Sequence, residues 1–222
     1  MISRLPRWVW SGAWALAFMA GIVNVVGILG FQHQAITHLT GNTSMLASAI
    51  ASFDLSGTLH FAAIIGSFVA GTALSGFIIQ DSVLQMGRRY GIALLLESLL
   101  LFIAVPLLNQ KHACGLYAAA CACGLQNAMA STYSGAVVRT THISGMFTDL
   151  GIFIGHALRR LPVDSKRLRL CLLVISGFFC GGIAGAIVFR FWGAATLYIP
   201  AALTGLAAIG YGIYQLTKVK PN

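Results

Sequence analysis

Six long apolar stretches limit what this chain can fold into. They cover roughly residues 8–30, 58–80, 90–108, 112–133, 168–190 and 194–216. Each is long enough to cross about 30 Å of hydrocarbon as a helix. Charged residues make up 9% of the chain, whereas a soluble domain needs roughly a quarter to cover its surface. The sequence therefore predicts an all-α integral membrane protein of about six transmembrane helices, with the lipid bilayer around it.

Two shorter apolar segments, 41–52 and 145–157, each follow a polar stretch that contains glycine or hydroxyl residues. As helices they would rise by only about 18–20 Å, which is too little to cross a membrane. We expect them to form half-helices or re-entrant segments. Thr40 or Thr43 would be the N-cap of the first segment, and Ser144 that of the second.

Basic residues lie in the gaps between the apolar stretches rather than in one patch. If the six long stretches cross and the N-terminus is inside, most of the 14 Lys and Arg residues are cytoplasmic, as the positive-inside rule requires. This predicts that both termini are cytoplasmic and that the loops at 81–89 and 158–168 share their side. The net charge of +9 is thereby explained without a nucleic-acid partner.

The two halves of the chain resemble each other. The segment THLTGNTSML begins at Thr37, and THISGMFTDL begins at Thr141. Upstream, GIVN at 21–24 matches GLQN at 124–127; downstream, GSFVAG at 66–71 matches SGFFCG at 176–181. We expect a single membrane domain of two repeats, 1–110 and 111–222, with three spans each. Because the number of spans is odd, the second repeat would be inverted relative to the first.

The H-x-T-G-N stretch carries a family resemblance. It consists of His38, Thr40, Gly41 and Asn42. Together with the pattern of spans, it resembles the YoaK-like family of uncharacterised bacterial multi-pass inner-membrane proteins, over nearly the whole chain. The resemblance implies a protein of the bacterial inner (plasma) membrane with about six spans. It implies no substrate and no reaction.

The paired motifs are candidates for a binding site. A helix that begins inside the membrane leaves backbone N–H groups unpaired at the positive end of its dipole, and two such ends facing each other would suit a small anion or a carboxylate. The candidate substrate-binding residues are His38, Thr40, Gly41, Asn42, Thr43, His142, Ser144, Gly145, Asn24 and Asn127. The alternative is that the motifs are surface loops, the histidines satisfy loop carbonyls and the two amides join helices.

Two acidic residues are candidates for proton coupling. Glu97 is the one acid within 90–108, and ionisable groups at this depth usually face the protein interior or water. The alternative for Glu97 is a packed side chain hydrogen-bonded to a neighbouring helix. Asp149 would stand in the first turn of the second half-helix, where it could simply stabilise the helix dipole. Arg139 would either neutralise Asp149 or attract an anion.

These features favour a secondary transporter of a small solute, preferably an anion, with proton coupling. A channel is the close variant, and a non-catalytic partner of another membrane complex is a further alternative. A membrane enzyme is the least favoured, because no HExxH or GxSxG motif occurs and the histidine spacings form no familiar metal-ligand set. The five cysteines lie within apolar runs, so we expect neither a metal nor a cofactor. A homodimer is compatible with the sequence.

Overall fold

The computed structural model describes residues 6–30, 34–80, 87 and 89–218. Its helices are α1 (Arg7–Leu29), α2 (Leu39–Ala51), α3 (Leu55–Ile78), α4 (Arg89–Asn109), α5 (Cys114–Ser134), α6 (Ile143–Leu158), α7 (Ser165–Trp192), the short 3-10 helix η3 (Gly193–Leu197) and α8 (Tyr198–Lys218). No strand occurs in these ranges. The prediction of an all-α chain is confirmed.

Each long apolar stretch of the sequence is a long helix. Within the described residues, four helical stretches are long and apolar enough to cross a membrane: Trp8–Leu29, Leu55–Ile78, Arg89–Asn109 and Ser165–Thr217. The last of these runs through α7, η3 and α8. Helix α5 is similar in length but carries more polar side chains, Gln126 and Asn127 among them. The loop predicted at 81–89 falls largely outside the described residues.

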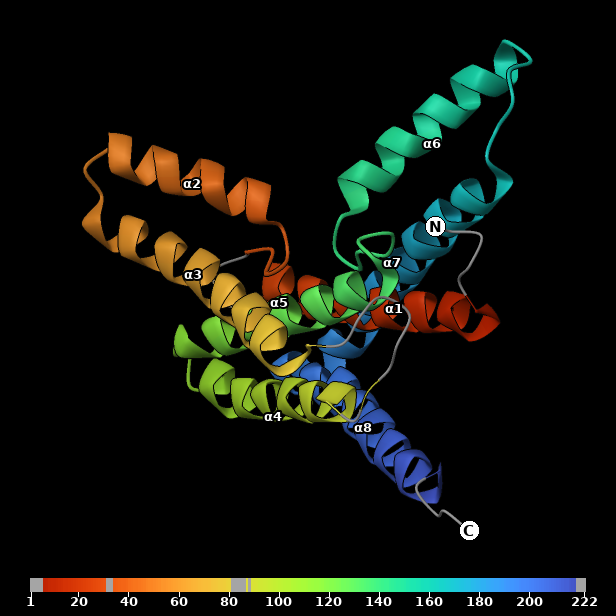
Figure 1. Cartoon of the computed structure of the whole chain (residues 1–222). Coiled ribbons are helices and arrows are strands. Elements are labelled where there is room, and N and C mark those ends of the chain that lie inside the picture. The colour runs from red at the N-terminus through yellow and green to blue at the C-terminus, as the bar shows by residue number, and fades with distance from the viewer. Residues whose placement is uncertain (1–5, 31–33, 81–86, 88, 219–222) are drawn as a thin grey trace.

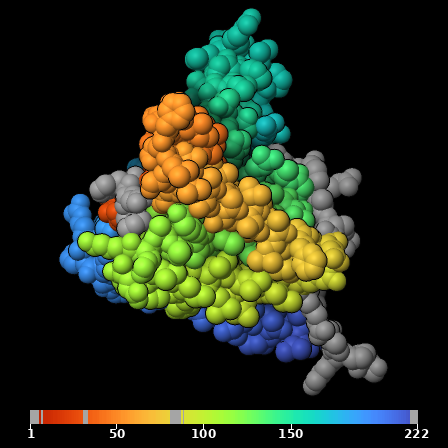
Figure 2. Space-filling view, turned by 90° about the vertical axis from the view of Figure 1, so that its left-hand side faces the viewer, coloured from red at the N-terminus to blue at the C-terminus, as the bar shows by residue number. Residues whose placement is uncertain are grey.

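The helices form a central body with two hairpins that point away from it. Helix α1 packs against α7, α3 packs against α5, and α4 contacts both α5 and α8. Helices α3 and α7 extend beyond this body, where α2 packs against α3 and α6 against α7, and the N-terminal ends of α2 and α6 lie nearest its centre (Figure 1). The space-filling view shows α2 (orange) and α6 (teal) protruding on the same side of the body (Figure 2).

A glycine in each helix permits the close crossing of α1 and α7. A Cβ on Gly21 would overlap the carbonyl oxygen of Phe178, and one on Gly181 would overlap the carbonyl oxygen of Phe18. Any larger residue would have to push the two backbones apart. This is the close approach that small residues allow between membrane helices.

The crossing of α3 and α5 has the same form. A Cβ on Gly124 would overlap the carbonyl oxygen of Phe68, and one on Gly71 would overlap that of Cys121. These two crossings hold the bundle together on either side of its centre. The small residues at both crossings serve internal packing. In contrast, Gly66 of α3 has open space where its Cβ would be.

A left-handed glycine ends α5 and begins the segment that leads to α6. Gly135 has φ 61°, and its N–H bonds the carbonyl oxygens of Ser131 and Thr132. Glycine adopts this conformation without steric cost and commonly ends helices. The chain then turns back through residues 136–142, here called the α5–α6 linker, toward the start of α6.

Candidate functional site

Both repeated motifs line one cavity of about 510 Å³. Its wall includes parts of α1, α3, α5 and α7 together with the N-terminal ends of α2 and α6. Six of the predicted binding residues line it: Asn24, His38, Thr40, Asn127, His142 and Ser144. The fold therefore brings together two segments that lie in opposite halves of the sequence.

The two half-helices begin in the same way, and differently from our expectation. His38 and His142 are the N-cap residues, with φ,ψ of −90°, 71° and −88°, 56°, and neither makes a side-chain capping hydrogen bond. The prediction that Thr40, Thr43 or Ser144 would cap them is wrong, because both helices start two residues before the predicted glycines. Hence the first N–H groups of α2 and α6 have no side-chain cap at the cavity.

At the outer ends of the two hairpins, unlike at the cavity, the helices begin with acidic side-chain caps. Asp54 caps α3 by accepting a hydrogen bond from the N–H of Gly57 at 3.0 Å. Asp164 caps α7 by accepting from the N–H groups of Lys166 and Arg167 at 3.0 and 3.1 Å. An acidic N-cap accepts hydrogen bonds from the first N–H groups, and its charge is favourable at the positive end of the helix dipole. The helix starts at the cavity are thus left without the acidic caps that the outer helix starts have.

Each motif glycine lies under the imidazole of the histidine three positions before it. A Cβ on Gly41 would lie 2.5 Å from Nδ1 of His38, and one on Gly145 would lie 2.6 Å from Nδ1 of His142. A larger residue at either position would force the histidine ring to move, because the ring occupies the space of a side chain. The repeated H-x-x-G spacing therefore places the histidine ring over the first turn of each helix.

The two matched amides have different surroundings. Asn24 Oδ1 accepts hydrogen bonds from Thr37, from its N–H at 3.1 Å and from its Oγ1 at 2.9 Å. Asn24 thus anchors the segment between α1 and α2. In the second half, Oδ1 of Asn127 is buried and has no hydrogen-bond partner among the described residues. Equivalent positions in the sequence are not equivalent in hydrogen bonding.

Asn42 and Thr43 support the motif from outside the cavity wall. Asn42 is buried, and its Nδ2 donates to the carbonyl oxygen of Ala35 at 3.2 Å. Thr43 is exposed, and its Oγ1 donates to the carbonyl oxygen of Leu39 at 2.8 Å. Neither residue is among those that line the cavity. Their hydrogen bonds are of the kind that shape a helix start rather than a ligand site.

Glu97 lies behind the cavity rather than in its wall. It is 2% exposed on α4, and its Oε1 accepts from Nε2 of Gln126 at 2.8 Å. Oε1 of Gln126 in turn accepts from Oγ1 of Thr140 at 3.3 Å. Oε2 of Glu97 is buried without a partner among the described residues. The chain of hydrogen bonds ends beside Arg139 and Thr141, which do line the cavity.

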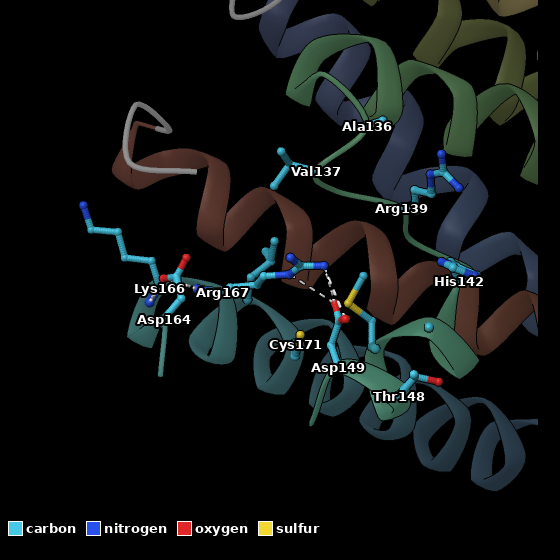
Figure 3. A pocket seen from close by; sticks show the side chains of 13 residues that line it. Ala136, Val137, Arg139, His142, Thr148, Asp149, Asp164, Lys166, Arg167 and Cys171 are labelled. Carbon is cyan, nitrogen blue, oxygen red and sulfur yellow. Dashed lines mark hydrogen bonds and ion pairs between the residues drawn. The ribbon is translucent and has the colours of Figure 1, made fainter. Parts of the chain in front are cut away.

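A second, larger hollow adjoins the first. This groove, of about 760 Å³, lies between the α5–α6 linker, α6 and α7 (Figure 3). Asp149 points into it and pairs with Arg167 of α7, with an N–O distance of 3.1 Å. Of the two alternatives for Arg139, neutralisation of Asp149 is contradicted by this pair, and attraction of an anion stays a prediction. The expectation that Asp149 stands in the first turn of α6 is wrong, because that helix begins at Ile143.

Some residues of the cavity wall are not among the predicted binding residues. Thr37, Thr141, Phe68 and Phe178 also line it. The signal for the two threonines was present, since each is the first residue of its repeated motif. The phenylalanines stand at matching places in the repeat but read as ordinary apolar residues of a span.

Of the six histidines of the chain, His33 lies outside the described residues. Among the residues that are described, no group of three or more His, Cys, Asp or Glu side chains could hold a metal ion.

Comparison with known proteins places the chain in a family. No curated protein and no solved structure matches it. A family described as a protein of unknown function, DUF1275, matches residues 12–210, which agrees with the resemblance to the YoaK-like proteins. Because this match covers most of the chain, the protein belongs to the DUF1275 family of proteins of unknown function.

Proposed function

We propose that this protein is a secondary transporter of a small anionic solute in the bacterial inner membrane. The observation that carries the proposal is the cavity of about 510 Å³ lined by both repeated motifs. Its size is in the range of small-molecule sites. A non-helical segment within a membrane is tolerated where it is buried or lines a cavity, and both motif segments meet that condition.

The proposal includes an inverted repeat of three spans, with α2 and α6 as the half-helices. The helix crossings support it. In the sequence alignment of the two halves, Gly21 corresponds to Gly124 and Phe68 corresponds to Phe178. Gly21 meets the carbonyl oxygen of Phe178, and Gly124 meets that of Phe68. This exchange of partners is what a two-fold relation between the halves requires.

An anion is favoured by the polarity of the cavity wall. The helix starts at Leu39 and Ile143 bring positive dipole ends to it. Arg139 adds a cation, and among the described residues of the wall there is no Asp or Glu. A negatively charged group is therefore the complement that this wall would bind best.

Proton coupling would use Glu97. Its hydrogen bond to Gln126, and that of Gln126 with Thr140, connect it to the α5–α6 linker that carries Arg139. A change in the charge of Glu97 would alter the acceptor that Gln126 bonds, and so the position of the linker. Both termini are proposed to be cytoplasmic, on the basis of the positive-inside rule.

A thermal-shift screen of the detergent-purified protein tests the proposal. The ligands are small carboxylates, phosphate, sulfate and common metabolites; a ligand that binds the folded state raises the melting temperature. Arg139→Gln should reduce the shift, whereas Arg159→Gln, which changes an exposed arginine at the end of α6, should retain it. Equal shifts in both variants would contradict the assignment of the cavity.

Transport assays then separate the remaining alternatives. Saturable uptake and counterflow of the ligand in proteoliposomes indicate a transporter, whereas flux that does not saturate indicates a channel. A protein that binds no anion in the screen and moves none would fit the partner-protein alternative.

A further inference from the structure

The cavity and the groove share two residues of their walls. Arg139 and His142 line both the cavity of about 510 Å³ and the groove of about 760 Å³. Arg139 lies in the α5–α6 linker and His142 caps α6. Figure 3 shows these two side chains together at one end of the groove. The two hollows are therefore neighbours that meet at this pair.

At its other end the groove reaches the start of α7. Asp164 and Lys166 line it there, beside the loop that joins α6 to α7, and Figure 3 shows them far from Arg139 and His142. A series of polar side chains, interrupted by apolar ones such as Met146, thus lines the groove from the α6–α7 loop to Arg139 and His142. The carboxylate of Asp164 is already engaged, because it caps α7.

The Asp149–Arg167 ion pair lies midway along this series. It joins α6 to α7, and its side chains are 24% and 53% exposed, respectively. The pair has no counterpart in the first half: the position of Asp149 in the THISGMFTDL motif corresponds to Met45 in THLTGNTSML. The α6–α7 side of the molecule thus has a charged groove that the sequence of α2 does not repeat.

We propose that the groove between α6 and α7 is the route by which a small anion reaches the cavity, and that the Asp149–Arg167 pair sets the charge of that route. The proposal rests on the proposed binding of an anion in the cavity. With the pair intact, Asp149 neutralises Arg167. Arg139 gives the inner end of the groove a positive charge, while Lys166 and the carboxylate of Asp164 lie together at the outer end. Removal of either partner would leave one uncompensated charge halfway along the route.

Thiol labelling in detergent tests this route directly. Ser144→Cys places a reporter in the cavity wall. The exposed or partly exposed cysteines at 114, 121 and 180, and Cys171, which lines the groove, are replaced by Ala. The probes are an anionic and a cationic methanethiosulfonate reagent of similar size. Asp149→Asn frees the Arg167 cation and should favour the anionic reagent. Arg167→Gln frees the Asp149 carboxylate and should favour the cationic one.

The measured quantity is the ratio of the anionic to the cationic labelling rate. We expect it to differ by about tenfold between the two variants at low salt, and less at high salt, because Coulomb interactions of partly exposed charges are screened. The charge-swapped protein with Asp149→Arg and Arg167→Asp should recover the wild-type ratio. The salt dependence of this ratio in the protein with Asp149 and Arg167 unchanged gives a second measurement, which does not depend on the folding of a substituted pair.

The matched control is Ser44→Cys on α2, which occupies the position of Thr148 in the repeat and is outside the groove. Its ratio should not respond to either substitution. Thr148→Cys lies in the groove and should respond in both. A response at Thr148 without one at Ser144 would show that solutes reach the cavity by another path and would overturn the proposal. If no anion raises the melting temperature of the wild-type protein, the proposed binding of an anion in the cavity is contradicted instead.

Discussion

The imidazole of His38 lies over Gly41 so closely that a Cβ on this glycine would lie 2.5 Å from Nδ1 of the ring. His142 has the same relation to Gly145, in the other half of the chain. Both histidines line the cavity. The glycine of each motif therefore leaves room for a cavity histidine, and neither glycine is among the predicted binding residues that line the cavity.

Gly41→Ala should displace the His38 ring while leaving the helix intact. Alanine favours a helix over glycine by about 1 kcal/mol, which offsets part of the steric cost, so we expect little change in melting temperature. Anion affinity should fall by about tenfold, equivalent to 1.4 kcal/mol. Titration of the ligand-induced thermal shift measures this. Gly151→Ala on α6, where a Cβ meets open space, is the control and should keep full affinity.

Gly124→Ala should destabilise the fold. The new Cβ would overlap the carbonyl oxygen of Phe68, and a backbone atom cannot rotate away, so α3 and α5 must separate. Overpacking of this kind typically costs about 1–3 kcal/mol. Unfolding in mixed micelles measures it.

Gly181→Ala should have a similar cost, because it meets the carbonyl oxygen of Phe18 in the same way. Gly76→Ala on α3 has open space around its Cβ and should be neutral or slightly stabilising. Equal stabilities for the 124 and 76 variants would contradict the close crossing of α3 and α5.

Gln126→Leu should destabilise the protein by about 1–3 kcal/mol. It removes the donor to Oε1 of Glu97, whose Oε2 already has no partner among the described residues. Replacing Glu97 by Leu as well removes both polar groups, so the double variant should be less unstable than the sum of the single ones. A double-mutant cycle of unfolding free energies measures this coupling. Strict additivity would show that the hydrogen bond contributes nothing.

Glu97→Gln should keep the fold and remove the pH dependence of transport. The new amide oxygen can still accept the hydrogen bond of Gln126, but the side chain can no longer exchange a proton. Uptake in proteoliposomes is compared between acidic and neutral pH for the wild type and the variant. Asp54→Asn, at the exposed start of α3, is the control and should retain the wild-type pH profile. An unchanged profile in the Glu97 variant would exclude this residue from proton coupling.

Much of the helical framework was predictable from the sequence. Long apolar stretches form helices because a segment without partners for its backbone polar groups cannot be buried in lipid or protein. The shortness of α2 and α6 was also readable, since it depends on the length of an apolar run. The repetition of the Thr-His motif indicated that both copies serve one purpose, and both do line one cavity.

The helix starts were predicted two residues too late. Ser and Thr are common N-caps, and propensity alone favoured Thr40 and Ser144. In the structure His38 and His142 are the N-cap residues, and their rings pack over Gly41 and Gly145. A frequency of residues at helix ends carries no information about such a ring contact.

The sequence alone determined which segments are helical and which residues recur in both halves, because apolar length and repetition are properties of the chain in order. Tertiary structure alone decided that Asp149 pairs with Arg167 and that Glu97 bonds Gln126 behind the cavity. Those contacts join different helices, so they depend on the rotation of each helix about its axis and on how closely glycines let the backbones approach. Neither the rotation of a helix nor the closeness of two backbones can be predicted from the local pattern of residues.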